Sequence, residues 1–140
     1  MKFYVVNRIP IKRRVRFNFK TGRAYTDSKT TADMKLVKSA YKGEYYTCPV
    51  ALIVLIYKQL PKQKRDSEPF DVKPDIDNVL KAVMDGLKGV AYRDDNQVTV
   101  TYARKMKRES TPGEYVKFAV LPAEKITGVL IDPSEVTNEI

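Results

Sequence analysis

Histidine and tryptophan are absent from the 140-residue sequence, and cysteine occurs once, at Cys48. Because imidazole is the commonest general base and metal ligand in proteins, the lack of histidine excludes Ser-His-Asp and Cys-His hydrolases, HExxH zinc enzymes and C2H2 zinc fingers. A single cysteine cannot form a disulfide within the chain, so we expect Cys48 to be a reduced, partly buried thiol. Any catalysis must therefore rest on Asp, Glu, Lys, Tyr or Ser side chains, together with a hard metal ion.

Long hydrophobic runs are also absent. The longest apolar stretch, Val50–Tyr57, is far shorter than the roughly 20 residues needed to cross a bilayer. Residues 1–16 mix apolar and basic side chains, so we expect no signal peptide. Neither predicted helix has a basic face opposite a large apolar one, which disfavours a membrane-surface protein. We therefore expect a cytoplasmic protein without membrane association.

Positive charge is concentrated in the first half of the chain. The sequence has 26 Lys and Arg against 17 Asp and Glu, a net charge of +9. Residues 1–70 carry a net charge of +11 and residues 71–140 a net charge of −2. A basic surplus of this size is typical of proteins that bind polyanions such as nucleic acid. Six aspartates nevertheless lie close together in the second half: Asp71, Asp75, Asp77, Asp85, Asp94 and Asp95.

The apolar pattern predicts a single small domain of the α+β class, with a mixed β-sheet and two main helices. We expect this domain to cover residues 1–121 and a peripheral tail to follow at residues 122–140. Val50–Tyr57 is continuously apolar, which is typical of a central strand buried on both faces. Further strands are expected at residues 3–6, 97–103 and 115–121, the last two joined as a hairpin by the turn at residues 111–113.

Two amphipathic helices are expected, one before and one after Val50–Tyr57 in the sequence. The first follows hydroxyl residues at positions 28–31, which are candidate N-caps, and ends before Gly43. The second covers residues 77–88 and is closed by Gly89. A basic segment with a turn at Thr21 and Gly22 precedes the first helix.

Carboxylates flank the second helix. Asp75 and Asp77 lie at its start, and Asp95 lies between its end and the next strand. A helix, a short turn and a strand can return the chain to the start of the helix, so these three side chains can converge. Mg²⁺ would relieve their repulsion, and a metal so held can polarise a phosphodiester and activate water. Lys81, one turn after Asp77, can stabilise charge on the phosphorane or the leaving oxygen.

Each of these residues also has a simpler interpretation. Asp75 or Asp77 can be an ordinary helix N-cap, and Asp94 and Asp95 can belong to a polar turn. Lys81 can be half of a surface ion pair between residues four apart. Spacing alone leaves both interpretations open.

Residues 73–87 read Lys-Pro-Asp-Ile-Asp-Asn-Val-Leu-Lys-Ala-Val-Met-Asp-Gly-Leu, and residues 89–98 read Gly-Val-Ala-Tyr-Arg-Asp-Asp-Asn-Gln-Val. Together they strongly resemble the RusA family of Holliday junction resolvases. The family pattern is D-x-D-N-x-x-K, then D-[AG]-L, then a short turn and D-D-x-Q-V, and every element is present. A weaker resemblance extends over residues 3–120 and leaves the tail uncovered.

The resemblance implies a Mg²⁺-dependent endodeoxyribonuclease, with Mn²⁺ able to substitute and no small-molecule cofactor. It implies a homodimer that resolves four-way DNA junctions by paired, symmetric phosphodiester cleavage in DNA recombination and repair. Two copies about a twofold axis match a substrate that is itself close to twofold symmetric. Val50–Tyr57 and the expected hairpin are candidate dimer interfaces, but a place in the core of one chain is the simpler interpretation of both.

Site residues follow from the same resemblance. Asp75, Asp77 and Asp95 match the metal-binding aspartates of the family, and Asp94 matches a less certain further ligand. Asp85 matches an acid to which we assign a structural role, as a cap or as an orienter of the loop after the helix. The four catalytic candidates are Asp75, Asp77, Lys81 and Asp95.

Basic residues in three groups are expected to contact DNA phosphates, which gives steep salt dependence without sequence reading. Phe70 can insert into the open centre of a junction or, equally well, anchor its loop in the core. The candidate DNA-binding residues are Arg13, Arg14, Arg16, Lys62, Lys64, Arg65, Lys73, Arg104, Lys105 and Lys107.

Two other function classes remain open. A nucleic-acid-binding module without catalysis would need only the basic half of the chain. A nuclease of the PD-(D/E)xK fold is disfavoured, because Pro74 and Asp75 offer its first half but no (D/E)-x-Lys follows on a predicted strand.

Overall fold

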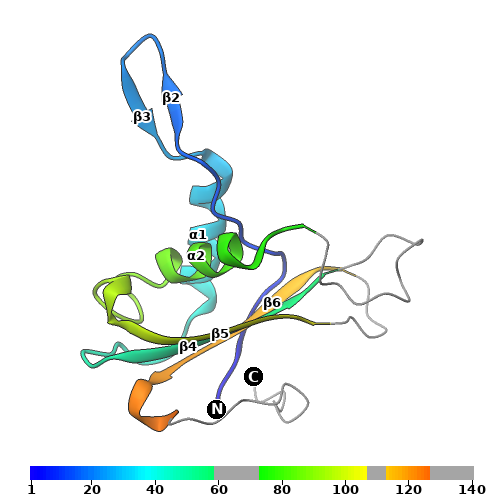
Figure 1. Cartoon of the computed structure of the whole chain (residues 1–140), viewed down its shortest axis with the longest axis vertical. Helices are drawn as coiled ribbons and strands as arrows, with labels where there is room; N and C mark the ends of the chain where they lie inside the picture. The colour runs from blue at the N-terminus through cyan, green and yellow to red at the C-terminus, as the bar shows by residue number, and fades with distance from the viewer. Residues whose placement is uncertain (59–72, 107–112, 127–140) are drawn as a thin grey trace.

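A four-stranded mixed sheet carries two helices on one face in this computed structural model, which describes residues 1–58, 73–106 and 113–126 (Figure 1). The strand order is β1-β6-β4-β5, and a separate two-stranded sheet, β2-β3, projects from the body. The expected single small α+β domain is confirmed. The elements are β1 (Tyr4–Val6), β2 (Arg16–Asn18), β3 (Arg23–Tyr25), α1 (Ser28–Ala40), β4 (Val50–Tyr57), α2 (Ile76–Gly86), η3 (Asp95–Gln97), β5 (Val98–Met106), β6 (Tyr115–Pro122) and η4 (Ala123–Lys125).

Strand β4 is the centre of the core, as its apolar sequence predicts. Its even-numbered side chains, such as Leu52 and Val54, pack with α1 and α2 in the main cluster. Its odd-numbered side chains Ile53 and Leu55 pack in a second cluster on the other face of the sheet. β4 therefore lies in the core of one chain.

Strands β5 and β6 lie on opposite sides of β4, so the hairpin expected between them is wrong. Leu52 pairs with Thr101 of the parallel neighbour β5 and with Val120 of the antiparallel neighbour β6. A strand buried on both faces must hydrogen-bond along both edges, because its backbone has little access to water. This long-range pairing outweighs the local turn signal, and α2 becomes the crossover of a βαβ unit.

Helix α1 is capped by Asp27 rather than by a hydroxyl side chain of residues 28–31. Oδ1 of Asp27 accepts a hydrogen bond from the backbone N of Lys29 at 2.8 Å. That bond is the main reason why the pKa of Asp27 lies below its usual range, and Arg16 adds to the effect. The C-cap is Tyr41, so the helix ends before Gly43 as expected, and Gly43 lies two residues beyond the C-cap.

Helix α2 packs closely on α1. A Cβ atom added to Gly86 would lie 2.8 Å from Cβ of Val37 and 3.0 Å from the carbonyl oxygen of Met34. α2 ends at Gly86, two residues before the predicted end. Gly89 lies in the turn that follows, where its φ of 84° favours glycine.

Residues after β6 pack beside the start of β4. The backbone N of Ala123 donates to the carbonyl of Pro49 at 2.9 Å, and Ile126 packs against the second cluster. Residues 127–140 of the predicted tail lie outside the described residues. Cys48 is exposed, not partly buried as expected. Within the described ranges, no helix is long and apolar enough to cross a membrane.

Candidate active site

The start of α2 presents two aspartates. Asp75 is the N-cap residue, yet its side chain makes no capping hydrogen bond, so the simple cap interpretation does not account for its carboxylate. Asp77 lies in the first turn and is exposed. Neither side chain has a hydrogen-bond or ion-pair partner within residues 1–58, 73–106 and 113–126. Both carboxylates are therefore available to a ligand near the positive end of the helix dipole.

Lys81 of α2 contacts Asp95 in η3, which directly precedes β5. Its Nζ donates to Oδ2 of Asp95 at 2.6 Å. This hydrogen bond is the largest cause of a lowered pKa at Asp95 and of a raised pKa at Lys81. Both groups are therefore charged at neutral pH, and Lys81 is suited to stabilise negative charge rather than to accept a proton.

Asp85 lies among three ammonium groups. Its carboxylate is 3.3 Å from Nζ of Lys12, 3.4 Å from Nζ of Lys81 and 3.5 Å from Nζ of Lys88. Oδ1 of Asp85 is buried and accepts no hydrogen bond within the part of the chain that the structure describes. The sequence interpretation missed Lys12 and Lys88, since neither belongs to the motif that carries the catalytic candidates.

Asp94 has the turn role that its sequence context allows. Its side chain accepts from the backbone N of Asp95 at 2.8 Å, and Gln97 completes a capping box around η3. Nε2 of Gln97 also donates to the carbonyls of Tyr46 and Cys48, at 3.0 and 3.2 Å. Gln97 therefore fixes the Asp94–Asp95 turn to the segment before β4, a positioning role that its place in the motif did not reveal.

The expected three-carboxylate cluster is not assembled. Among the described residues, no three acidic side chains come together closely enough to hold a metal ion. Mg²⁺ commonly uses only one or two carboxylates, completed by water and substrate phosphate. The oxygen donors of Asp75 and Asp77, unused by other described side chains, fit that chemistry.

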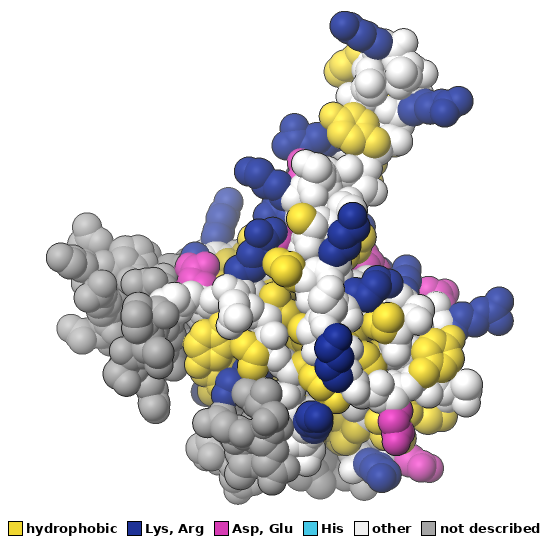
Figure 2. All heavy atoms as spheres, turned by 180° about the vertical axis from the view of Figure 1, so that it is seen from behind, with side chains coloured by type: hydrophobic (Ala, Val, Ile, Leu, Met, Phe, Trp, Pro, Cys, Tyr) yellow, Lys and Arg dark blue, Asp and Glu magenta, His cyan; other side chains and the backbone are white. Residues whose placement is uncertain are grey.

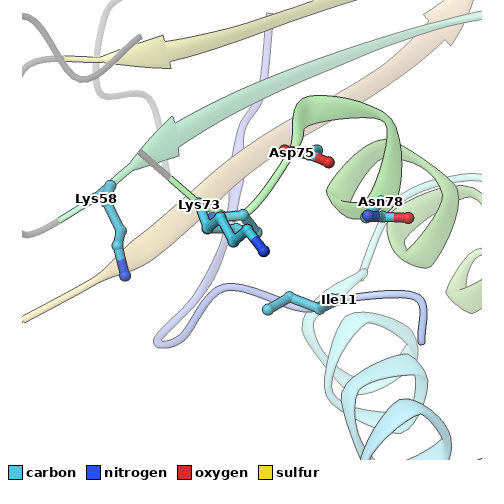
Figure 3. Close-up of a pocket in the computed structure, with 6 residues that line it drawn as sticks. Ile11, Lys58, Lys73, Asp75 and Asn78 are labelled. Atoms are coloured by element: carbon cyan, nitrogen blue, oxygen red, sulfur yellow. The ribbon is translucent and has the colours of Figure 1, made fainter. Parts of the chain in front are cut away.

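A cavity of about 340 Å³ opens beside Asp75 (Figure 3). Ile11, Lys58, Lys73, Pro74 and Asn78 complete its lining. The backbone N of Lys12 donates to the carbonyl of Asn78 at 2.9 Å and holds the N-terminal segment against α2. Two lysines and a carboxylate around one hollow suit a phosphate group and a cation.

The candidate DNA-binding residues divide into four classes. Arg13 and Arg16 are occupied by ion pairs to Asp33 and Asp27, at 3.0 and 2.6 Å. Lys105 is buried, with only 7% exposure, which argues against a phosphate contact. Arg14, Lys73 and Arg104 are exposed and make no ion pair within the described residues. Lys62, Lys64, Arg65 and Lys107 lie outside the described residues, as do Phe70 and Asp71.

Comparison with known proteins gives a family. Residues 8–118 match the family described as endodeoxyribonuclease RusA, and this range includes both helices and every catalytic candidate. The chain belongs to the RusA family. The uncharacterized protein YqaN of Bacillus subtilis (strain 168) is 36% identical over 75 residues, which cover 45% of this chain and 53% of that relative. This chain thus spans about half the length of the curated relative that it matches. The RusA family is one of endodeoxyribonucleases, which agrees with the two aspartates at the start of α2 and with the Lys81–Asp95 pair.

Proposed function

We propose that this chain is a Mg²⁺-dependent, structure-specific endodeoxyribonuclease that resolves four-way DNA junctions by paired, symmetric nicks. The observation that carries the proposal is the RusA family match over residues 8–118. The geometry of α2 supports it, because the carboxylates of Asp75 and Asp77 are available at its start and Asp77 lies one turn before Lys81, which pairs with Asp95. The proposed context is DNA recombination and repair in the cytoplasm.

Asp75 and Asp77 are the proposed holders of the metal ion, with Asp95 as a further ligand candidate. When bound, Mg²⁺ supplies a Lewis acid for the phosphodiester and lowers the pKa of a bound water, and Mn²⁺ can substitute. Lys81 keeps its proton and places positive charge where the phosphorane or the leaving oxygen becomes negative. Asp95 and Asp85 position its ammonium group, which lies 2.6 Å from Oδ2 of Asp95 and 3.4 Å from Oδ1 of Asp85.

The substrate strand is proposed to pass along the cavity beside Asp75. Lys58 and Lys73 line it and would contact phosphates next to the scissile one. Nζ of Lys58 also contacts Oε1 of Glu114 at 2.6 Å, which fixes its position without removing its charge. Arg14 and Arg104 extend the basic surface, so binding should weaken steeply with salt.

A homodimer follows from the proposed reaction. Each chain carries one candidate site, whereas resolution of a junction needs two related cuts. A twofold axis through the dimer would place the two sites symmetrically on a substrate that is itself close to twofold symmetric.

The test compares Asp75→Asn with Glu124→Gln, an exposed carboxylate in η4 that serves as the matched control. Each purified protein is incubated with a labelled four-way junction in Mg²⁺, in Mn²⁺ and in chelator. We expect metal-dependent cleavage by the wild type and by Glu124→Gln. Asp75→Asn should bind the junction at least as well as the wild type and leave it uncut, because one source of repulsion with DNA is gone. Full cleavage by Asp75→Asn would overturn the assigned site.

A further inference from the structure

Exposed hydrophobic side chains gather on the β2-β3 arm, which comprises residues 14–26. Of the eight large hydrophobic side chains exposed within the described residues, the arm holds Val15, Phe17, Phe19 and Tyr25. Phe19 is 91% exposed. The arm projects away from the sheet and helices, and hydrophobic and basic side chains alternate along it (Figures 1 and 2). Apolar rings concentrated on one projecting element are typical of an interaction surface.

The rings of Phe17 and Phe19 lie next to each other and are 51% and 91% exposed. Phe17 belongs to β2 and Phe19 to the turn that follows it, and their ring centroids lie 5.1 Å apart, edge to face. Asn18 between them fixes the turn, because its Oδ1 accepts from the backbone N of Lys20 at 2.9 Å. Across the hairpin, Phe17 is opposite Ala24, so only a methyl group faces its ring.

The base of the arm is fastened to α1. Nε of Arg16 contacts Oδ2 of Asp27 at 2.6 Å, and Asp27 also caps the helix. The backbone N of Arg13 donates to Oγ1 of Thr30 at 3.1 Å. These contacts hold the entry to the arm against a helix of the body. The rings are thus presented in a defined direction rather than on a free loop.

Charge identifies the chemistry of the partner. No acidic residue occurs in residues 1–26. Arg14, Lys20 and Arg23 on the arm make no ion pair within the described residues. The complementary surface is therefore negative, and it must also offer flat apolar faces to the two rings. Nucleic acid combines phosphates with base faces, whereas the arm of a second copy would repel this one.

We propose that the arm is a second DNA-contacting element that stacks Phe17 and Phe19 on unpaired bases while Arg14, Lys20 and Arg23 contact the neighbouring phosphates. Base faces are covered by stacking in a linear duplex and become accessible in single strands and at a branch point. The arm therefore favours branched or single-stranded DNA over duplex. The inference rests on the proposed function only in taking DNA as the polyanion.

The test measures binding by fluorescence anisotropy in chelator, with a labelled single strand, a linear duplex and a four-way junction. The double variant Phe17→Ser/Phe19→Ser is compared with Tyr45→Ser, whose ring is 51% exposed but lies off the arm. We expect the double variant to bind the single strand and the junction about tenfold to a hundredfold more weakly. Its duplex affinity and thermal midpoint should stay as in the wild type, and Tyr45→Ser should match the wild type throughout.

A charge variant separates stacking from phosphate contact. Lys20→Gln/Arg23→Gln should weaken binding to all three DNAs and reduce the salt slope on the single strand by about 1.4. Wild-type affinity of the double phenylalanine variant for the single strand overturns the proposal. A dimer that dissociates in sedimentation velocity when the phenylalanines are replaced, with DNA affinity unchanged, assigns the arm to a second copy instead and also overturns it.

Cleavage assays on the same preparations separate this proposal from the proposed function. If the phenylalanine substitutions weaken DNA binding but the wild type never cuts DNA, the proposed role of the arm is supported and the proposed nuclease activity is refuted. If the wild type cuts the junction with metal and the substitutions leave binding unchanged, the role of the arm is refuted and the nuclease activity is not affected.

Discussion

Replacing Lys81 by methionine removes one ammonium group from the candidate active site while keeping an unbranched side chain. The structure offers a close control in Lys88. Both ammonium groups lie within 4 Å of the same two carboxylates: Lys81 is 3.4 Å from Asp85 and 2.6 Å from Asp95, and Lys88 is 3.5 and 3.8 Å from them. Their side chains are also similarly exposed, at 47% and 40%. Only Lys81 donates a hydrogen bond to Asp95.

The two substitutions should therefore have similar effects on stability and different effects on catalysis. Ion pairs of half-exposed lysines contribute about 0–1 kcal/mol, so each variant should lose at most about 1 kcal/mol of unfolding free energy. Asp85 keeps two of its three ammonium neighbours in either variant. Loss of a group that stabilises transition-state charge typically lowers the rate by about 10² to 10³.

The assay is single-turnover cleavage of a labelled junction at saturating protein, alongside urea unfolding of each variant. We expect Lys81→Met to cut about 10² to 10³ times more slowly than the wild type. Lys88→Met should stay within about fivefold, because it makes the longer and weaker contact to Asp95. Equal loss of cleavage in the two variants, or a wild-type rate in Lys81→Met, would refute the special role of Lys81.

Three further predictions concern packing, pH and salt. Gly86→Ala should lower the unfolding free energy by about 1–2 kcal/mol in urea, because the new Cβ collides with Val37, and an unchanged midpoint would contradict the close approach of the helices. The depressed pKa of Asp95 stabilises the fold above its ordinary value of 3.8, and that contribution disappears as the pH falls through the lower, folded pKa. Asp95→Asn should therefore show a shallower loss of stability below pH 4 than the wild type, measured by urea unfolding across pH, and parallel curves would count against the Lys81 pair. Arg14→Gln should reduce the salt slope of duplex binding by about 0.9 without changing the preferred DNA, whereas an unaltered slope would remove Arg14 from the phosphate contacts.

Elements with a strong apolar pattern could be predicted from the sequence. Val50–Tyr57 is apolar at every position, so a central buried strand was the natural expectation. The partners of that strand could not be derived in the same way. Strand pairing depends on which surfaces need covering in three dimensions, and the turn at residues 111–113 suggested a local hairpin that β4 in fact separates.

The β2-β3 arm has no apolar pattern from which its strands could be predicted. All six residues of β2 and β3 are exposed, so burial imposes no alternation of apolar and polar side chains. Only the turn glycine, Gly22, with a φ of 68°, identified its tip. Asp33 was likewise missed: a lone aspartate on a helix suggests a solvated face, yet this one is fully buried and pairs with Arg8 and Arg13.

The candidate site was predictable as a motif but not as a network of contacts. The spacing of Asp75, Asp77, Lys81 and Asp95 suggested that they converge. The structure pairs Lys81 with Asp95, but it gathers no three carboxylates among the described residues. The sequence did not indicate that Asp85 would gather three lysines, because Lys12 reaches it from a distant segment.

We propose junction-specific cleavage by a metal site on α2. The most direct test maps nicks on a four-way junction and on a linear duplex of the same sequence, each in Mg²⁺ and in chelator. We expect paired nicks at symmetric positions on two opposed strands of the junction. These nicks should require Mg²⁺ and be absent from the duplex. Equal cutting of the linear duplex, or cutting that persists in chelator, would contradict the proposal.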